Sequence, residues 1–271
     1  MAARLPEGKY DNDFNPLLYL NGRLGIDWIT AQRNNGDRDR VLFPLQCYHE
    51  FFATSELAAR RNISFLDYGI GPNLSALMSA APHASEMILC DYADSNLEYL
   101  QQWVNKVPTG YDWTPHFEYV VNYLERNEKE DAVEEREELI RNTVKAIVPG
   151  DLTKQSVIQS GYEGPYDVVH LALTLDVTAK TVDDYKAQIK KVASLVKPGG
   201  KIILLEVERR MGLEYFYEHA GRTWHFLGVT CEFVANTLEE AGFTDVYVKT
   251  AGPADKTKHR NYMFFSATKT V

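Results

Sequence analysis

The stretch Phe65-Leu66-Asp67-Tyr68-Gly69-Ile70-Gly71-Pro72-Asn73 decides the fold of this chain. The apolar run at 63–66 leads into a turn with two glycines, and Pro72 suits the first position of a following helix. Gly69 and Gly71 remove Cβ atoms where a ligand must approach the backbone closely. The order of strand, glycine turn and helix is typical of a nucleotide-binding unit in a parallel sheet.

A second predicted strand ends in an acidic residue. The apolar run 87–90 precedes Asp91, which follows Gly71 by 20 positions. A carboxylate at this place in α/β nucleotide sites binds the ribose hydroxyls. Its presence favours a ribose-containing ligand over a purely structural turn.

The glycine turn departs from the G-x-G-x-x-G pattern of dinucleotide-binding proteins. In that pattern the third glycine lets helix and strand pack closely. Here Leu74 stands in its place. Asp67, two residues before the first glycine, would repel a phosphate and favours a cationic ligand. The sequence therefore predicts a nucleoside without phosphate, and S-adenosylmethionine fits that description.

Length and composition restrict the remaining possibilities. A chain of 271 residues favours one large α/β domain with additions rather than two cores. The formal charge of −9 speaks against a nucleic-acid partner, because phosphate binding needs clustered Lys and Arg. The three widely spaced cysteines form no metal or redox pattern. Neither an apolar leader nor a long apolar run is visible, so we expect a cytoplasmic protein that does not enter membranes. We also expect the protein to be a monomer.

Strand and helix patterns alternate beyond Asp91. Further strands are predicted at 117–121, 146–148, 166–173, 201–206, 243–249 and 262–265, the last two as an antiparallel pair. Helices are predicted at 94–106 and 182–196, with a solvated helix face in the charged run 125–141. This alternation predicts an α/β fold with a doubly wound, Rossmann-like sheet.

The N-terminal part has a different character. Residues 1–60 contain no strand followed by a glycine turn, and 48–59 have a helical composition. We expect residues 1–60 to form a helical lid over the ligand site and residues 61–271 to form the domain that binds the ligand.

Acidic residues follow several of the predicted strands. Asp151 comes shortly after the strand 146–148. Because ligands of doubly wound sheets lie across the carboxyl ends of the strands, Asp151 is placed to accept a hydrogen bond from an adenine amine. A role in a turn or as a helix cap explains this residue equally well.

Several motifs together resemble the class I S-adenosylmethionine-dependent methyltransferases. More narrowly, they resemble the small-amine branch with nicotinamide, phenylethanolamine, indolethylamine and thioether methyltransferases. The motifs are Phe14-Asn15-Pro16 with Tyr19, Asp67-x-Gly69-x-Gly71-Pro72, Asp91-Tyr92-x-Asp94-x-Asn96-Leu97, Asp112-Trp113-x-Pro115, Asp151-Leu152-Thr153 and Leu195-Val196-Lys197-Pro198-Gly199-Gly200. The resemblance implies a seven-stranded sheet, S-adenosylmethionine as methyl donor and S-adenosylhomocysteine as product.

The resemblance also implies which residues bind the cofactor. They are Tyr19 over the methionine carboxylate, Asp67, Gly69 and Gly71 at the amino acid end, Asp91 and Tyr92 at the ribose, Asn96 nearby, and Asp151 with Leu152 around the adenine. Each position carries a residue type that suits the implied role.

Two carboxyl groups are implied at the substrate and are the predicted catalytic residues. Glu206 takes the place of an aspartate that grips the amide of nicotinamide, and it is one methylene longer. Asp176 matches an acid that faces the substrate amine in the phenylethanolamine enzyme. Both would attract a cationic amine, and one would accept its proton. A salt bridge with Arg209 or Arg210 is the alternative interpretation of Glu206.

These observations predict an S-adenosylmethionine-dependent N-methyltransferase that acts on a small amine or pyridine-type nitrogen. No metal is expected, because the sulfonium is already an activated leaving group and no side-chain cluster has metal-ligand spacing. Three alternatives stay open, namely a thioether or thiol S-methyltransferase, a cofactor-binding protein with little turnover, and an NAD-dependent oxidoreductase. Residues 209–217 lack the Ser-Ser-Tyr-Tyr pattern of the nicotinamide enzyme, so a pocket of different shape is expected.

Overall fold

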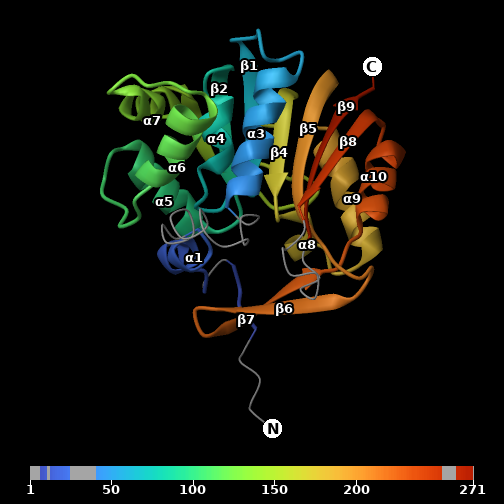
Figure 1. The fold of residues 1–271 in the computed structure, drawn as a ribbon. Coiled ribbons are helices and arrows are strands. Elements are labelled where there is room, and N and C mark those ends of the chain that lie inside the picture. The colour runs from blue at the N-terminus through green and yellow to red at the C-terminus, as the bar shows by residue number, and fades with distance from the viewer. Residues whose placement is uncertain (1–6, 11–12, 25–40, 252–260, 271) are drawn as a thin grey trace.

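A seven-stranded sheet forms the centre of the computed structural model, which describes residues 7–10, 13–24, 41–251 and 261–270 (Figure 1). The strand order is β3-β2-β1-β4-β5-β9-β8. All neighbours are parallel except β9, which runs antiparallel to β5 and β8. The predicted Rossmann-like seven-stranded sheet is confirmed. Its strands are β1 (Ile63–Tyr68), β2 (Ala84–Asp91), β3 (Val144–Pro149), β4 (Tyr166–Ala172), β5 (Val196–Glu208), β8 (Phe243–Ala251) and β9 (Asn261–Lys269).

Helices cover both faces of this sheet (Figure 1). The inner strands are buried on both sides, and alternate residues of β5 belong to opposite cores. Ile203 packs into one buried cluster with α3, whereas Ile202 packs into the other with α9 and α10. The helices are α1 (Pro16–Arg23), α3 (Leu42–Thr54), α4 (Ser75–Ala80), α5 (Asp94–Val104), α6 (Thr114–Glu118), the π-helix η1 (Tyr119–Leu124), α7 (Ala132–Thr143), α8 (Leu175–Thr178), α9 (Val182–Ala193) and α10 (Cys231–Glu240).

Local sequence explains where the helix α9 begins. The Thr181 hydroxyl accepts a hydrogen bond from the Asp184 amide, 3.1 Å away. The Asp184 carboxylate in turn accepts from the Thr181 amide at 3.0 Å. This capping box satisfies two amide groups that a helix start otherwise leaves unpaired.

The prediction of a strand at residues 117–121 is wrong. This segment belongs to α6 and η1, and Pro115 occupies the first turn of α6. The buried residues Phe117, Val120 and Val121 have the spacing of one helix face. Aromatic and β-branched residues suggested a strand, but so short a run cannot distinguish the two periods.

A second, two-stranded sheet was not predicted. It consists of β6 (Glu214–His219) and β7 (Arg222–Leu227), which pair antiparallel. The N-terminal segment lies beside β7, because the Gly8 amide donates to the Thr223 carbonyl at 2.9 Å. Figure 1 shows this hairpin across the end of the sheet where β4 terminates, near α1 and α8.

Residues before β1 contribute to the core as well as to its surroundings. Helix α3 places Leu45, Tyr48 and Phe52 in the buried cluster that also contains Phe65. Helix α1 instead lies near the end of the sheet where the hairpin is found (Figure 1). Among the described residues, no helix has the length and apolar character needed to cross a membrane.

Candidate functional site

The glycine turn and Asp91 meet at the carboxyl ends of β1 and β2. The Gly71 amide donates to Asp91 Oδ2 at 2.7 Å. Asp91 Oδ1 accepts from the Ala93 amide and from Asn96 Nδ2, both at 2.9 Å. The structure therefore brings together Gly71, Asp91 and Asn96, as the sequence predicted for residues that share one ligand.

Asp91 and Asn96 also present acceptors that fit a ribose. Both carboxylate oxygens of Asp91 are hydrogen-bond acceptors, and they already accept from the Gly71 and Ala93 amides and from Asn96. Asn96 Oδ1 is buried and has no hydrogen-bond partner in the described structure. Two neighbouring acceptors of this kind suit two adjacent hydroxyl donors. Burial raises the pKa of Asp91, and the hydrogen bonds from Asn96 and the backbone amides oppose that shift.

Gly69 approaches the chain at the end of β4. Its φ angle is +68°, and an added Cβ atom would lie 2.4 Å from Thr174 Oγ1. The Thr174 hydroxyl donates to the Gly69 carbonyl at 3.2 Å. Gly71 has a similar φ of +61° but no atom within 4 Å of an added Cβ. Of these two glycines, Gly69 is therefore the one at which both the positive φ and the packing against Thr174 exclude a side chain.

We expect Gly69→Ala to destabilise the fold more than Gly71→Ala. An alanine at positive φ costs about 1–2 kcal/mol in either place, and Gly69→Ala adds the collision with Thr174. The free energies of unfolding in urea should show this order. Equal losses for the two variants would mean that Thr174 simply moves aside.

Asp67 lies below the turn and is fully buried. Its Oδ1 atom is 2.8 Å from His170 Nδ1. The sequence predicted that this acid would serve a cationic ligand, and nothing indicated His170 as its partner. His170 lies in β4, opposite Asp67 in the sheet register.

Asp151 stands in a turn next to the end of β2. Its Oδ1 atom accepts from the Thr153 amide at 2.8 Å and from the Thr153 hydroxyl at 2.6 Å. The Gly150 amide donates to the Asp91 carbonyl at 3.0 Å, so this turn adjoins the ribose acceptors. The Thr153 contacts are those of the turn interpretation, and Leu152 beside them is buried.

Tyr92 and Tyr19, two further predicted cofactor residues, lie in different elements. Tyr92 follows Asp91 directly and is 48% exposed. Tyr19 lies in α1, with its ring centroid 5.3 Å from that of Phe14. The Ser95 hydroxyl of α5 donates to the Phe14 carbonyl at 3.2 Å, which ties this N-terminal segment to the helix after Asp91.

Glu206 is buried near the carboxyl end of β5, with 1% of its surface exposed. Oε1 accepts a hydrogen bond from the Tyr185 hydroxyl of α9 at 2.9 Å. Oε2 has no hydrogen-bond partner among the described residues. The hydrogen-bond partner of Glu206 is therefore Tyr185, and in the described part of the chain no ion pair joins Glu206 to Arg209 or Arg210, the predicted alternative.

Asp176 is a second buried carboxyl group, located in the first turn of α8 after β4. Its Oδ1 atom also has no hydrogen-bond partner in the described part of the chain. Burial raises the pKa of Asp176 to about 7, although backbone amides and Arg209 oppose the shift. Burial and the negative charge of Asp176 raise the pKa of Glu206 well above its usual range, against the hydrogen bond from Tyr185. Near neutral pH the two carboxyl groups therefore retain a proton between them.

Aromatic side chains from the N-terminus and the hairpin lie near Asp176. The hydroxyls of Tyr10 and Tyr217 are 2.8 Å apart. The ring of Trp224 meets that of Tyr10 edge-on at 4.5 Å. Burial raises the pKa of both tyrosines, and the charge of Asp176 contributes to each shift. These residues form an aromatic wall beside the acid pair.

Sequence reasoning missed Tyr10 and Tyr185. Tyr185 shares the buried face of α9 with Ile189, so the helical pattern indicates burial. That pattern cannot indicate that its hydroxyl meets Glu206. Tyr10 precedes the Phe14-Asn15-Pro16 motif and carries no signal of its own.

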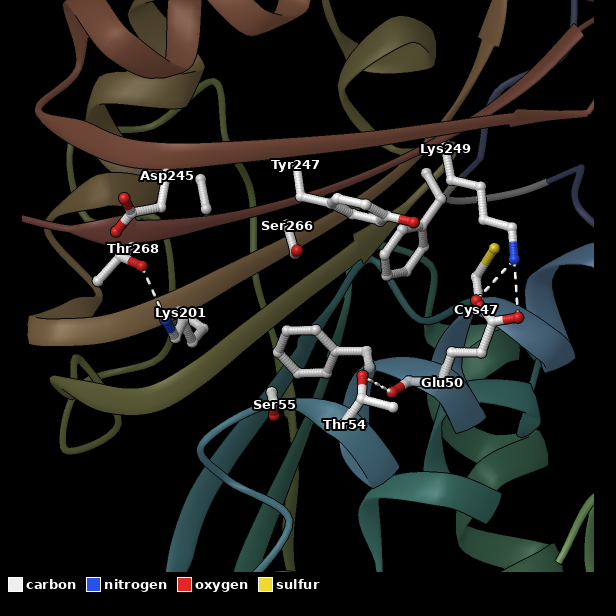
Figure 2. A pocket seen from close by; sticks show the side chains of 13 residues that line it. Cys47, Glu50, Thr54, Ser55, Lys201, Asp245, Tyr247, Lys249, Ser266 and Thr268 are labelled. Carbon is white, nitrogen blue, oxygen red and sulfur yellow. Dashed lines mark hydrogen bonds and ion pairs between the residues drawn. The ribbon is translucent and has the colours of Figure 1, made fainter.

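A separate cavity of about 280 Å³ lies between α3 and the outer strands β5, β8 and β9. Figure 2 shows Lys249 directed toward Glu50, with a shortest ion-pair distance of 2.6 Å. Burial raises the pKa of the neighbouring Cys47 thiol to about 12, so this thiol is unreactive. None of the predicted site residues lines this cavity. Among the described residues, no group of His, Cys, Asp and Glu is placed to hold a metal ion.

Comparison with known proteins identifies the family. The sequence matches the NNMT/PNMT/TEMT family over residues 4–270. Nicotinamide N-methyltransferase of Homo sapiens is 30% identical over 179 residues, which are 66% of this chain and 65% of that enzyme, just under two thirds of its length. Indolethylamine N-methyltransferase of Mus musculus is 29% identical over 235 residues, or 86% of this chain and 83% of that enzyme.

A solved structure shows the shared fold. It is the 1,6-didemethyltoxoflavin-N1-methyltransferase of Burkholderia thailandensis with bound S-adenosylhomocysteine, which has a TM-score of 0.50 at 16% identity and covers 95% of this chain and 92% of its own. The sequence match extends over nearly the whole chain and agrees with the observed sheet order. This chain therefore belongs to the NNMT/PNMT/TEMT family of S-adenosylmethionine-dependent methyltransferases.

Proposed function

We propose that this protein transfers a methyl group from S-adenosylmethionine to the nitrogen of a small amine or pyridine-type compound. The observation that carries the proposal is the buried pair Glu206 and Asp176, each with one oxygen that has no hydrogen-bond partner among the described residues. Glu206 lies near the carboxyl end of β5 and Asp176 follows β4, and the carboxyl ends of these parallel strands lie on the same edge of the sheet as Asp91. Buried carboxyl groups without partners are costly, so their retention suggests a polar ligand.

The cofactor fits the acceptors at the other side of this edge. Asp91 Oδ2 and Asn96 Oδ1 have the chemistry to hold two ribose hydroxyls. The open side of Gly71 leaves room for close approach of a ligand to the turn. The binding residues that we propose are Tyr19, Asp67, Gly69, Gly71, Asp91, Tyr92, Asn96, Asp151 and Leu152.

The residues of this chain orient and deprotonate the substrate. Bound S-adenosylmethionine supplies a methyl group on a positively charged sulfur, which is a good leaving group. An alkylamine is a cation at neutral pH and must lose a proton before its nitrogen can attack. The ionised carboxyl group of the pair attracts this cation and takes the proton, while Tyr10 and Trp224 shield the site from water.

The described N-terminal residues support a covering role. Asp13 forms an ion pair with Arg222 of the hairpin at 3.1 Å, next to the contact between Tyr10 and Tyr217. We propose that residues 1–60 include the lid and that residues 61–271 form the methyltransferase domain. Because α3 packs in the core, residues 7–10 and 13–24 are the described part that suits a lid.

The cellular setting is proposed from the sequence. The charge of −9 supports a protein that binds small molecules rather than nucleic acid. We propose a cytoplasmic monomer that stays off membranes, and size-exclusion chromatography with light scattering tests its oligomeric state.

The proposal predicts turnover with a nitrogen nucleophile. Release of S-adenosylhomocysteine should be measured with nicotinamide, quinoline, phenylethanolamine, tryptamine and a dialkyl sulfide. Turnover with one or more of the nitrogen compounds is expected, and Lys249→Ala, at the remote cavity, should match the wild type. Turnover with the sulfide alone would mean that the substrate is a thioether and not an amine. Cofactor binding without turnover on any compound would contradict the substrate class, and binding of NAD instead would contradict the cofactor.

A further inference from the structure

Three buried polar side chains connect the glycine turn to α3. They come from three elements, Asp67 in β1, His170 in β4 and Tyr48 in α3, with exposed fractions of 1%, 3% and 1%. His170 Nδ1 lies 2.8 Å from Asp67 Oδ1, and His170 Nε2 lies 3.0 Å from the Tyr48 hydroxyl. Asp67 and His170 are direct neighbours in the register of β1 and β4. The sheet therefore fixes this contact independently of any ligand.

The chemistry of the three groups defines the direction of the hydrogen bonds. Burial and the nearby charge of Asp67 raise the pKa of Tyr48 well above its usual range, so the hydroxyl keeps its proton. It can donate that proton to His170 Nε2. Because the Tyr48 hydroxyl donates to Nε2, that nitrogen is the acceptor of the ring, and Nδ1 carries the hydrogen that faces Asp67 Oδ1. The arrangement in which Tyr48 donates to His170 and His170 donates to Asp67 satisfies all three groups.

Aromatic rings hold the imidazole in place. The ring of Tyr48 meets it at 89° with centroids 5.0 Å apart, and the ring of Phe65 stacks against it at 6.3 Å. His170 has little freedom to rotate in this environment. Without His170, the buried side chain of Asp67 would lose the hydrogen-bond partner that holds it in place.

We infer that His170 is a positioning residue for the cofactor, which keeps Asp67 fixed beneath the Gly69–Gly71 turn while Tyr48 fixes the imidazole. Asp67 is two residues from Gly69, and Gly71 in turn donates to Asp91. A shift of Asp67 therefore reaches the backbone that meets the ribose acceptors. The inference rests on the proposed cofactor site and adds a role for two residues that do not touch the ligand.

The inference predicts a selective loss of cofactor affinity. His170→Leu removes the donor to Asp67 and should weaken S-adenosylhomocysteine binding about 10- to 30-fold. His170→Asn places an amide N–H near the position of Nδ1 and should stay within about 3-fold of the wild type. Tyr48→Phe removes only one hydroxyl and should cost about 3- to 5-fold. The KM for S-adenosylmethionine should follow these changes, while kcat at saturation changes less than 2-fold, roughly, since Glu206 and Asp176 are untouched.

Calorimetric titration with S-adenosylhomocysteine tests the inference without requiring turnover. The titration compares the affinities of the wild type, the three variants and the remote control Lys249→Ala. Unfolding curves are recorded first to show that each protein is folded. Proton-detected ¹⁵N NMR of labelled histidine should show His170 as the Nδ1–H tautomer, identified by the signal lost in His170→Asn. Equal affinity for wild type, His170→Leu and Tyr48→Phe would overturn the inference, as would equal losses in His170→Asn and His170→Leu. If His170→Leu does not fold, the affinity of Tyr48→Phe for S-adenosylhomocysteine and the tautomer of His170 seen by NMR test the inference in its place. Failure of the wild type to bind would instead reject the proposed function.

Discussion

Asp91→Ala should reduce the affinity for S-adenosylmethionine by roughly two to three orders of magnitude. The carboxylate supplies an acceptor for the ribose and also holds the Gly71 amide and the Asn96 side chain. Its loss removes a charged hydrogen bond to the ligand, worth about 1.5–3 kcal/mol, and leaves buried donors unpaired. A total near 3–4 kcal/mol corresponds to about 150- to 900-fold.

Calorimetry with S-adenosylhomocysteine measures this effect directly. Asn96→Ala removes the neighbouring acceptor but leaves Asp91 in place, so a smaller loss of about 10-fold is expected. Unfolding curves are needed alongside, because Asp91 also organises the turn. If Asp91→Ala is folded and binds within about 5-fold of wild type, the ribose is held elsewhere and the assignment of this edge fails.

The glycine turn and Asp91 could be predicted because their signals are local. Strand, turn, helix and acid follow one another within 30 residues of Ile63, and parallel pairing of β1 with β2 brings their ends together without further information. The same holds for Glu206 and Asp176 as strand-end acids. Their positions on one edge follow from the order of the sheet.

The hairpin of β6 and β7 escaped prediction because its turn residues are unusual. Ala220 and Gly221 form a two-residue connection, with φ angles of +51° and +70°. Such turns favour Asn-Gly or Asp-Gly, since most side chains resist positive φ. Ala-Gly does not signal this geometry, although Phe216 and Trp224 belong to segments with strand-forming aromatic residues.

The sequence also did not predict the contacts between side chains that are far apart along the chain. Tyr185 meets Glu206 across a helix and a strand, and His170 meets Asp67 across 103 residues. A sequence pattern indicates that such side chains are buried, but not which buried group they face. Such contacts depend on register and on the packing of helices against the sheet, and both are set by the whole fold.

Glu206→Gln should lower kcat about 100- to 1,000-fold for an alkylamine substrate while S-adenosylhomocysteine affinity stays within about 2-fold. Glutamine keeps an acceptor for the Tyr185 hydroxyl, so the pocket should stay folded, but it can take no proton. Asp91 and Asn96 are untouched. Initial rates and calorimetry on the same preparation separate the two effects, and a parallel loss of cofactor affinity would contradict the assignment of Glu206 to the substrate.

The pH dependence distinguishes a proton acceptor from a residue that only shapes the pocket. Because burial raises the pKa of Asp176 to about 7 and also raises that of Glu206 well above its usual range, the pair is protonated in acid and the rate should rise with pH through neutrality. Asp176→Asn removes the negative neighbour that raises the pKa of Glu206, so the rising limb should move to lower pH even as the maximal rate falls. Tyr185→Phe removes the hydrogen bond that lowers this pKa, so the limb should move to higher pH. If the pH at which the rate rises shifts in opposite directions in these two variants, ionisation of the carboxyl pair controls the rate. If the pH profile is unchanged in both variants, ionisation of the amine substrate controls the rate instead.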